Sequence, residues 1–519
     1  MNKISAETFL YDREIKKDFD YNMWFMFAGP ESFALSSLGY LWLYRSIDML
    51  GDVDIERVYS DTKTTRIMRD KVDLIGFSFS FDMDFLTIFK FLEWNKFEFK
   101  SADRKEIDPI LFAGGPVVSA NPEPYSQIFD FIIIGDGEDA NIEAIKLCKQ
   151  LKGSPKKEVL KALSQIEGVY VPSLEKNYVK KTTKKLTECI YTPIISKNAF
   201  FSNTFILEVE RGCANRCGFC LASYLNLPIR FVDYEKIIET IELGLKYTNK
   251  IALLGAQITA HPKFGDVCKY IEAKIDEGFS IEMSVSSLRV DSFTEPIVKT
   301  LVKAGQKNLT LAIEAGSERL RKVINKNLTE EQIYSAIEVA QKCGLKGIKF
   351  YGMIGLPTET QDDIEEIVNL CKRIKAKYKR FEISFGFSTF VPKANTPFQW
   401  FGREAEKSVE AKANYLKKEL HKLGIQVTIS SAKWDYYQAV LSRGDSNLTD
   451  YMIEVYKQGG KLGAFKKAAK SLGIDTDYYA TVTYPYDKDF PWNFIDIVPG
   501  KEFLINESKK LIGFSQNIF

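Results

Sequence analysis

Short apolar runs alternate with helical stretches from Met23 to about Leu147. Four runs of consecutive apolar residues have the length of buried strands, and segments between them carry apolar residues at helical spacing. The predicted strands are residues 24–27, 74–77, 110–113 and 131–134, and the predicted helices include 36–50 and 84–94. Because helical crossovers place successive strands parallel, the pattern predicts a doubly wound α/β domain built on one parallel sheet.

A second alternation of strand and helix extends from Thr204 to about Pro397. The predicted strands are residues 205–209, 251–254, 281–285, 309–315, 348–354 and 383–390. Six βα units in a row predict a partial or complete parallel barrel. Beyond residue 400 the alternation gives way to a mixed α+β tail, with helices expected at 404–423 and 450–471. We therefore expect a first domain at 1–150, a connector with a short strand at 151–200, a (βα)6 barrel at 201–400 and a C-terminal α+β extension at 401–519.

The charge balance of the 519-residue chain limits its partners. Lys and Arg number 71 and Asp and Glu 69, which leaves a formal net charge of +2. Such a chain has no strong field for polyanions, so nucleic acid is unsupported as a partner. No run approaches 18 apolar residues, and residues 1–8 lack the basic and apolar regions of a signal peptide. We expect a cytoplasmic protein with no membrane contact.

Three of the eight cysteines fall within eight residues. Cys213, Cys217 and Cys220 form a Cys-x3-Cys-x2-Cys pattern, which would arise by chance in roughly two of a thousand chains of this length. A structural zinc site requires four protein ligands, but the chain has no second cysteine pair and only two histidines, His261 and His421. A 4Fe-4S cluster on three cysteines leaves one iron open for a non-protein ligand. The pattern therefore favours an iron–sulfur cluster.

The cysteine loop, residues 210–220 with the sequence ERGCANRCGFC, resembles the cluster loop of the radical S-adenosylmethionine (SAM) superfamily. The resemblance includes the aromatic residue before the third cysteine and the position after the first barrel strand. It implies that Cys213, Cys217 and Cys220 ligate a 4Fe-4S cluster and that SAM chelates the open iron through its amino and carboxylate groups. One electron from the cluster would cleave SAM to methionine and a 5'-deoxyadenosyl radical. The resemblance also implies an electron donor of the flavodoxin or ferredoxin type.

Turns after the later barrel strands resemble the SAM-binding motifs of the same superfamily. The implied SAM-binding residues are Gly255 and Ala256 after the second strand, Ser286 and Arg289 after the third, Glu314 at the end of the fourth, and Gly352, Ile354 and Gly355 at the end of the fifth. In the superfamily these positions serve the SAM amino group, the ribose or carboxylate, the ribose or methionyl end, and adenine, in that order. The usual Gly-Gly-Glu of the second strand is absent here.

One branch of the superfamily has a sixth strand that ends as residues 391–398 do, and it carries an N-terminal cobalamin-binding domain. Residues 20–150 resemble that domain, and the glycine turns at Gly29, Gly115 and Gly137 are the implied cobalamin contacts. The family's cobalt-ligating histidine is missing, because no histidine precedes His261. Any cobalamin would therefore be bound without a protein imidazole, between the first domain's strand ends and the barrel mouth. The similarity continues through residues 168–172, 443–445 and 491–492 to a largely uncharacterised subgroup.

Three functions are compatible with these patterns. The first is a cobalamin-dependent radical SAM enzyme, most simply a C-methyltransferase. The second is a cobalamin-independent radical SAM enzyme, whose first domain serves as a scaffold or substrate site. The third, an iron–sulfur electron carrier, is disfavoured because a carrier needs neither an open iron nor SAM-like turns. The domain resemblance favours cobalamin and the missing histidine opposes it. The sequence identifies neither the substrate nor the catalytic residues that act on it.

Overall fold

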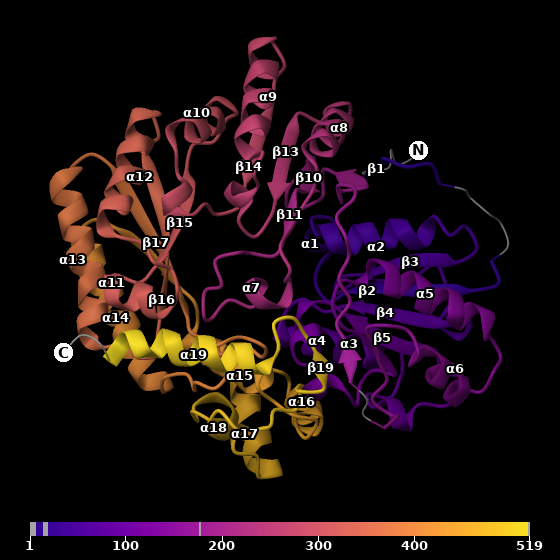
Figure 1. The fold of residues 1–519 in the computed structure, drawn as a ribbon. Coiled ribbons are helices and arrows are strands. Elements are labelled where there is room, and N and C mark those ends of the chain that lie inside the picture. Colours follow the sequence, from indigo (N-terminus) through magenta and orange to yellow (C-terminus); the bar gives the residue numbers. More distant parts are fainter. Residues whose placement is uncertain (1–6, 14–18, 176–177, 517–519) are drawn as a thin grey trace.

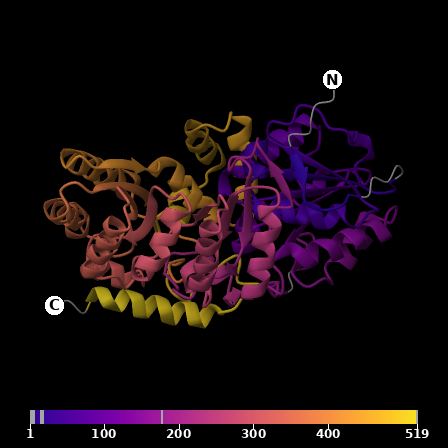
Figure 2. The ribbon, with the colours of Figure 1, turned by 90° about the horizontal axis from the view of Figure 1, so that it is seen from above.

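The computed structural model describes residues 7–13, 19–175 and 178–516. Two α/β units lie side by side, and the C-terminal helices run along both of them (Figures 1 and 2). Of the helices that the structure describes, none is long and apolar enough to cross a membrane.

The first unit contains a six-stranded sheet with the order β3-β2-β4-β5-β6-β7. Its strands are β2 (Asn22–Phe27), β3 (Asp54–Tyr59), β4 (Leu74–Ser78), β5 (Ile110–Gly114), β6 (Phe131–Ile133) and β7 (Val169–Tyr170). Five strands are parallel, and β7 pairs antiparallel with β6. The four predicted strands are confirmed. Sequence reading missed β3, because this edge strand interrupts its apolar residues with Glu56 and Arg57.

Helices cover both faces of this sheet. The helices of the unit are α1 (Glu31–Ala34), α2 (Leu38–Asp48), α3 (Phe85–Trp94), α4 (Pro116–Ala120), α5 (Gly137–Gln150) and α6 (Lys156–Leu163). Met23 and Phe25 face the core under α2, α5 and α6, whereas Trp24 and Met26 face the core under α3. This alternation follows from the two-residue period of a strand and explains why β2 is apolar throughout.

The second unit is a partial barrel of parallel strands in two sheets, β10-β13-β14 and β15-β16-β17-β18. A single bridge between Leu288 and Leu311 joins them. The strands are β10 (Thr204–Glu208), β13 (Lys250–Leu254), β14 (Glu282–Val285), β15 (Leu309–Glu314), β16 (Gly347–Ile354), β17 (Glu382–Thr389) and β18 (Gln426–Ile429). The six predicted strands are confirmed, and β18 is an additional seventh, which sequence reading had left in the tail.

The barrel helices lie outside the strands (Figure 1) and bury one large apolar core against them. They are α8 (Tyr234–Leu245), α9 (Phe264–Asp276), α10 (Glu295–Lys303), α11 (Glu318–Val323), α12 (Glu330–Lys342), α13 (Gln361–Lys377) and α14 (Glu406–Lys422). A capping box starts α12, since Thr329 and Gln332 bond each other's backbone. The other described strands form three separate two-stranded sheets: β1 (Glu7–Phe9) with β9 (Ile194–Ser196), β8 (Val179–Lys180) with β19 (Ile495–Asp496), and β11 (Glu210–Arg211) with β12 (Arg230–Phe231).

The C-terminal helices join the core of the first sheet. They are α15 (Ala432–Ser442), α16 (Leu448–Lys457), α17 (Leu462–Leu472), α18 (Thr476–Ala480) and α19 (Lys501–Gln516). Phe465 and Trp492 belong to the same buried cluster as Trp24 of β2. The prediction of one helix over 450–471 is wrong, because Gly459 and Gly460 take φ of +92° and +66° and separate α16 from α17.

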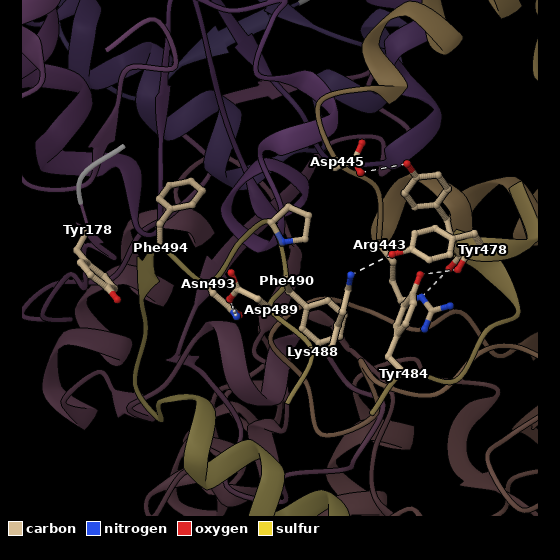
Figure 3. A pocket seen from close by; sticks show the side chains of 12 residues that line it. Tyr178, Arg443, Asp445, Tyr478, Tyr484, Lys488, Asp489, Phe490, Asn493 and Phe494 are labelled. Carbon is tan, nitrogen blue, oxygen red and sulfur yellow. Dashed lines mark hydrogen bonds between the residues drawn. The ribbon is translucent and has the colours of Figure 1, made fainter. Parts of the chain in front are cut away.

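A cavity of about 510 Å³ lies among aromatic residues of this C-terminal region (Figure 3). Arg443 lines it, but its guanidinium donates to the backbone carbonyls of Tyr479, Val482 and Phe401 and stacks 4.6 Å from the Tyr484 ring. The arginine therefore holds loops of the tail together.

The first unit contains a buried ion pair, and loss of this pair should lower the free energy of unfolding. Asp130 and Arg104 are both fully buried, and Asp130 also pairs with Lys156 and accepts a hydrogen bond from the Leu111 amide. We expect Asp130→Ala to lower the free energy of unfolding by about 3 to 5 kcal/mol, because it leaves Arg104 charged and unpaired.

Urea denaturation followed by circular dichroism measures this loss. The matched control is Glu167→Ala, which removes a partner of Lys180 from an exposed pair and should cost no more than about 1 kcal/mol. Equal costs for the two variants would contradict the prediction.

Candidate functional site

The cysteine loop begins at the end of the first barrel strand. The strands β11 and β12 form its base, and Gly212 takes φ +94° with the Asn226 carbonyl 2.6 Å from where a Cβ would stand. A side chain at this position would clash with backbone, so only glycine allows the chain to enter the loop. The loop therefore lies at the carboxyl ends of the parallel strands, where barrels concentrate function.

Backbone contacts from distant segments hold the loop in place. The Gly218 amide donates to the Ile324 carbonyl at 3.1 Å, and the Phe398 amide donates to the Gly218 carbonyl at 3.1 Å. The Asn325 side chain donates to the carbonyls of Asn215 and Arg216 at 2.9 and 3.1 Å. The ends of two other barrel units thus fix the conformation of the loop.

The structure places the three cysteines on this loop with limited access to solvent. Cys213 and Cys217 are buried and Cys220 is half-buried. Within the described ranges, no three His, Cys, Asp or Glu side chains are already arranged around a metal position. Three thiols on one short loop next to buried cations are the donor set that a 4Fe-4S cluster requires. The residues present therefore fit such a cluster by their chemistry.

Charged side chains from β14, β15 and the segment after α11 surround Cys217. Burial raises the pKa of Cys217 to about 12, and the positive charge of Lys326 offsets part of that rise. The Lys326 ammonium binds Glu314 at 3.1 Å, and the Arg289 guanidinium donates to the Lys326 carbonyl at 3.0 Å. Arg289 also pairs with Asp291 at 2.8 Å. Two cations and one carboxylate from separate turns thus converge beside the cysteine loop.

The backbone of Glu314 is strained. Glu314 takes φ +66° at the point where the pairing of β15 with β16 shifts register, and it lies opposite Gly352. A non-glycine residue in the left-handed region costs energy and occurs often at functional sites. The turn brings Glu314 beside Lys326 and sets Gly352 next to it in the sheet.

The remaining SAM-site predictions lie on the same edge of the barrel. The Ser286 hydroxyl donates to the Gly255 carbonyl at 3.0 Å, which joins the second and third turns. Gly355 ends β16 with φ +79°, and its amide donates to Glu359 at 2.9 Å. The structure therefore brings the eight predicted residues to consecutive strand ends, with Ala256 beside Gly255 and Ile354 beside Gly355.

The glycine turns of the first sheet do not all meet. Gly115 and Gly137 line a cavity of about 460 Å³ together with Glu208 and Leu254 from the ends of β10 and β13. Gly29 lies outside the residues that line this cavity. The strand ends of the first sheet therefore face the barrel mouth, with α7 (Ala222–Leu225) between them (Figure 1).

Ion pairs cross this cavity wall. Arg211 binds Asp136 at 3.1 Å, Glu138 at 2.7 Å and Glu208 at 2.7 Å, and Arg230 also binds Asp136. Burial alone would raise the pKa of Asp136, but the two arginines hold it below its ordinary value. The acidic turn after β6 is therefore locked onto the base of the cysteine loop.

Sequence reading missed two charged residues of the site, Lys326 and Glu210. Lys326 lies in a polar turn with no distinctive spacing. Glu210 is part of the cysteine-loop sequence but shows no pattern that would separate it from Glu208. His261, in contrast, is satisfied within the fold, since its ring nitrogens bond the Val232 carbonyl and the Lys263 amide.

Comparison with known proteins places these features in a family. The model of the radical SAM superfamily matches residues 207–371, and the model described as radical SAM proteins, N-terminal, matches residues 39–172. The uncharacterised protein MJ0966 of Methanocaldococcus jannaschii is 34% identical over 401 residues, which are 76% of this chain and 83% of that protein. The chain belongs to the radical SAM superfamily. It is accordingly a radical SAM enzyme, and such enzymes require a reductant.

Two solved structures share the fold of this radical SAM enzyme. The cobalamin-dependent SAM radical enzyme OxsB aligns with a TM-score of 0.53 at 13% identity, over 96% of this chain and 80% of that one. The radical SAM methyltransferase TsrM of Kitasatospora setae aligns with a TM-score of 0.50 at 10% identity, over 70% of this chain and 74% of that one. The predicted α/β fold class with parallel sheets is confirmed, and the predicted partial barrel is consistent with these structures.

The buried carboxyl group of Glu210 should make stability depend on pH. Burial raises the pKa of Glu210 from 4.5 to about 7, so the folded protein binds a proton that the unfolded chain releases. This contribution to stability is fully present below about pH 4.5 and is lost as the pH rises through about 7. We expect the unfolding free energy of the wild type to fall by about 1 to 2 kcal/mol relative to Glu210→Gln over that interval.

Thermal and urea unfolding of the metal-free proteins at several pH values measure the difference. The exposed Glu167→Gln is the control and should follow the wild type. Parallel profiles for the wild type and Glu210→Gln would contradict the prediction.

Proposed function

We propose that the enzyme holds a 4Fe-4S cluster on Cys213, Cys217 and Cys220 and cleaves SAM reductively to start radical chemistry. The observation that carries this proposal is the convergence of the cysteine loop with Arg289, Lys326 and Glu314 at one barrel edge. When bound, the cluster supplies one electron to the sulfonium group of SAM.

The residues around the loop match the polarity of SAM. Arg289 and Lys326 offer positive charge to a carboxylate, and Glu314 offers a hydrogen-bond acceptor to hydroxyl groups. Gly255 and Ala256 present backbone groups on the second turn. Gly352, Ile354 and Gly355 form an apolar strand end, and a Cβ at Gly352 would stand 2.5 Å from the Phe387 ring, so glycine is required at this position.

The reductant in this proposal is a flavodoxin- or ferredoxin-type protein, because the reaction consumes single electrons. The substrate is unassigned. No charge pattern on the chain favours nucleic acid as that substrate, given the net charge of +2.

Loss of any one of the three cysteines should abolish the cluster. We expect Cys213→Ala, Cys217→Ala and Cys220→Ala, after anaerobic reconstitution with iron and sulfide, to lose the visible absorbance and iron content of the wild type. The wild type with SAM and a low-potential reductant should form 5'-deoxyadenosine, which chromatography detects.

The matched control is Cys343→Ala, because Cys343 is half-buried at the end of α12, away from the loop. It should retain both the cluster and SAM cleavage. Full iron content in the triple alanine variant would refute the cluster assignment.

The second candidate function is cobalamin-dependent C-methylation. The fold favours it, since OxsB and TsrM hold cobalamin in their structures. The local chemistry opposes it, because the chain provides no histidine before residue 261 and Asp136 and Glu138 are engaged by Arg211. The residues present do not fit cobalamin, so we rank the cobalamin-independent enzyme first.

An anaerobic titration of the reconstituted protein with hydroxocobalamin, followed by gel filtration, separates the two candidates. We expect no stoichiometric retention and intact SAM cleavage, because the ion pairs of Arg211 engage the polar side chains of the cavity wall. Stoichiometric retention, with a base-off spectrum and no histidine nitrogen coupling in the cobalt(II) state, would instead favour the methyltransferase.

A further inference from the structure

Among the buried charged atoms that have no hydrogen-bond partner within the described residues, two belong to residues whose turns contact each other beside the cysteine loop. They are Oε2 of Glu210 and Nη1 of Arg289. Glu210 is only 1% exposed. A buried carboxylate oxygen that bonds nothing costs free energy, so the fold retains it against its own stability. Such an atom is best explained by a ligand that the protein binds.

Packing directs the Glu210 side chain into the turn after the second barrel strand. A Cβ at Gly255 would stand 2.4 Å from Cγ of Glu210, so glycine is required there for the carboxyl group to pass. Oε1 of Glu210 accepts the backbone amide of Gln257. Glu210 thus places an acidic group in the turn that lacks the superfamily's usual glutamate.

The same turn contacts the cysteine loop. The Gln257 side chain bonds Asn215 and lies 3.9 Å from the Cys213 sulfur. Ser286, on the turn that leads to Arg289, donates to the Gly255 carbonyl at 3.0 Å. The unpartnered carboxylate and the unpartnered guanidinium nitrogen therefore lie on adjoining turns beside one proposed cluster ligand.

Opposite charges on adjoining turns match the two ends of an α-amino acid. The α-carboxylate can form an ion pair with the guanidinium group of Arg289. An α-ammonium group, in contrast, has no lone pair and must lose a proton before its nitrogen can bind a metal. A protein that binds SAM through this nitrogen therefore needs an acceptor for that proton.

We propose that Oε2 of Glu210 accepts the proton that the α-ammonium group of SAM loses on binding, and afterwards holds the neutral amino group by a hydrogen bond. The N–H bond breaks, its electron pair stays on nitrogen, and an O–H bond forms on the carboxyl group, so no proton is released to solvent. The inference rests on the proposed function and adds a residue to it.

The surroundings of Glu210 suit this transfer. Burial raises the pKa of Glu210 to about 7, close to the value of roughly 8 for an ordinary α-amino group. The negative charge of Glu208 also raises the pKa of Glu210, and the adjacent Arg211 is engaged by Glu208, Asp136 and Glu138. Oε1 remains bonded to Gln257.

The test counts the protons released when SAM binds. Calorimetric titration of the cluster-loaded protein with SAM at pH 7.5, in two buffers of different ionisation enthalpy, gives that number. We expect the wild type to release close to none and Glu210→Gln to release most of one proton, because the α-ammonium is largely protonated at this pH. SAM should bind Glu210→Gln about 10-fold more weakly.

Glu167→Gln is the control, since it removes a carboxylate from an exposed pair with Lys180 and not from the surroundings of Glu210. It should keep the proton count of the wild type. Glu210→Asp, a second variant for the case in which Glu210→Gln does not fold, should also keep this count while binding SAM more weakly.

Release of most of a proton by the wild type would overturn the inference, whether or not the variants fold. Equal proton counts for the wild type and Glu210→Gln would overturn it as well. Failure of the wild type to bind SAM at all would instead refute the proposed function.

Discussion

The guanidinium group of Arg211 ties the cysteine loop to the first sheet, and the geometry of the candidate site depends on that contact. Arg211 precedes Gly212 and Cys213 directly and binds carboxylates from both units. Burial opposes its charge, yet Glu208, Glu138 and Asp136 raise its pKa. Removing Arg211, or the carboxylates that it binds, would leave buried charges unpaired and would lower the free energy of unfolding. The acidic turn and the cysteine loop therefore behave as one body.

The C-terminal segment also packs against the cysteine loop. A Cβ at Gly218 would stand 2.9 Å from Leu511 of α19, and the Arg216 guanidinium stacks 5.2 Å from the Phe503 ring. The tail also supplies Phe465 and Trp492 to the core of the first sheet. The chain must therefore fold to its end before the loop is fully packed, and the tail belongs to the site as much as the barrel does.

The sequence predicts those parts of the fold that a single physical signal determines. Buried parallel strands show as continuous apolar runs, and the cysteine spacing identifies the loop. The edge strands β3 and β18 are not predicted because neither is a continuous apolar run: Glu56 and Arg57 interrupt β3, and polar and apolar residues alternate in β18. The sequence does not predict Lys326 and Glu210 as site residues, for a different reason. Their role depends on which turns meet in space, and neither has a local pattern that records this.

The candidate site and the buried ion pair of the first unit differ in how their charges are satisfied. In the first unit, Asp130 is buried with two cations and a backbone amide, so its charge is compensated within the fold. At the barrel edge, Glu314 is strained at φ +66°, and Glu210 and Arg289 each keep an unpartnered atom. Each such defect costs about 1 to 3 kcal/mol. The burial of large apolar cores in both units can offset this loss of folding free energy. A ligand with complementary charges would reduce the loss when it binds. The strained Glu314 and the unpartnered atoms of Glu210 and Arg289 therefore coincide at the barrel edge, where the proposed ligand would bind.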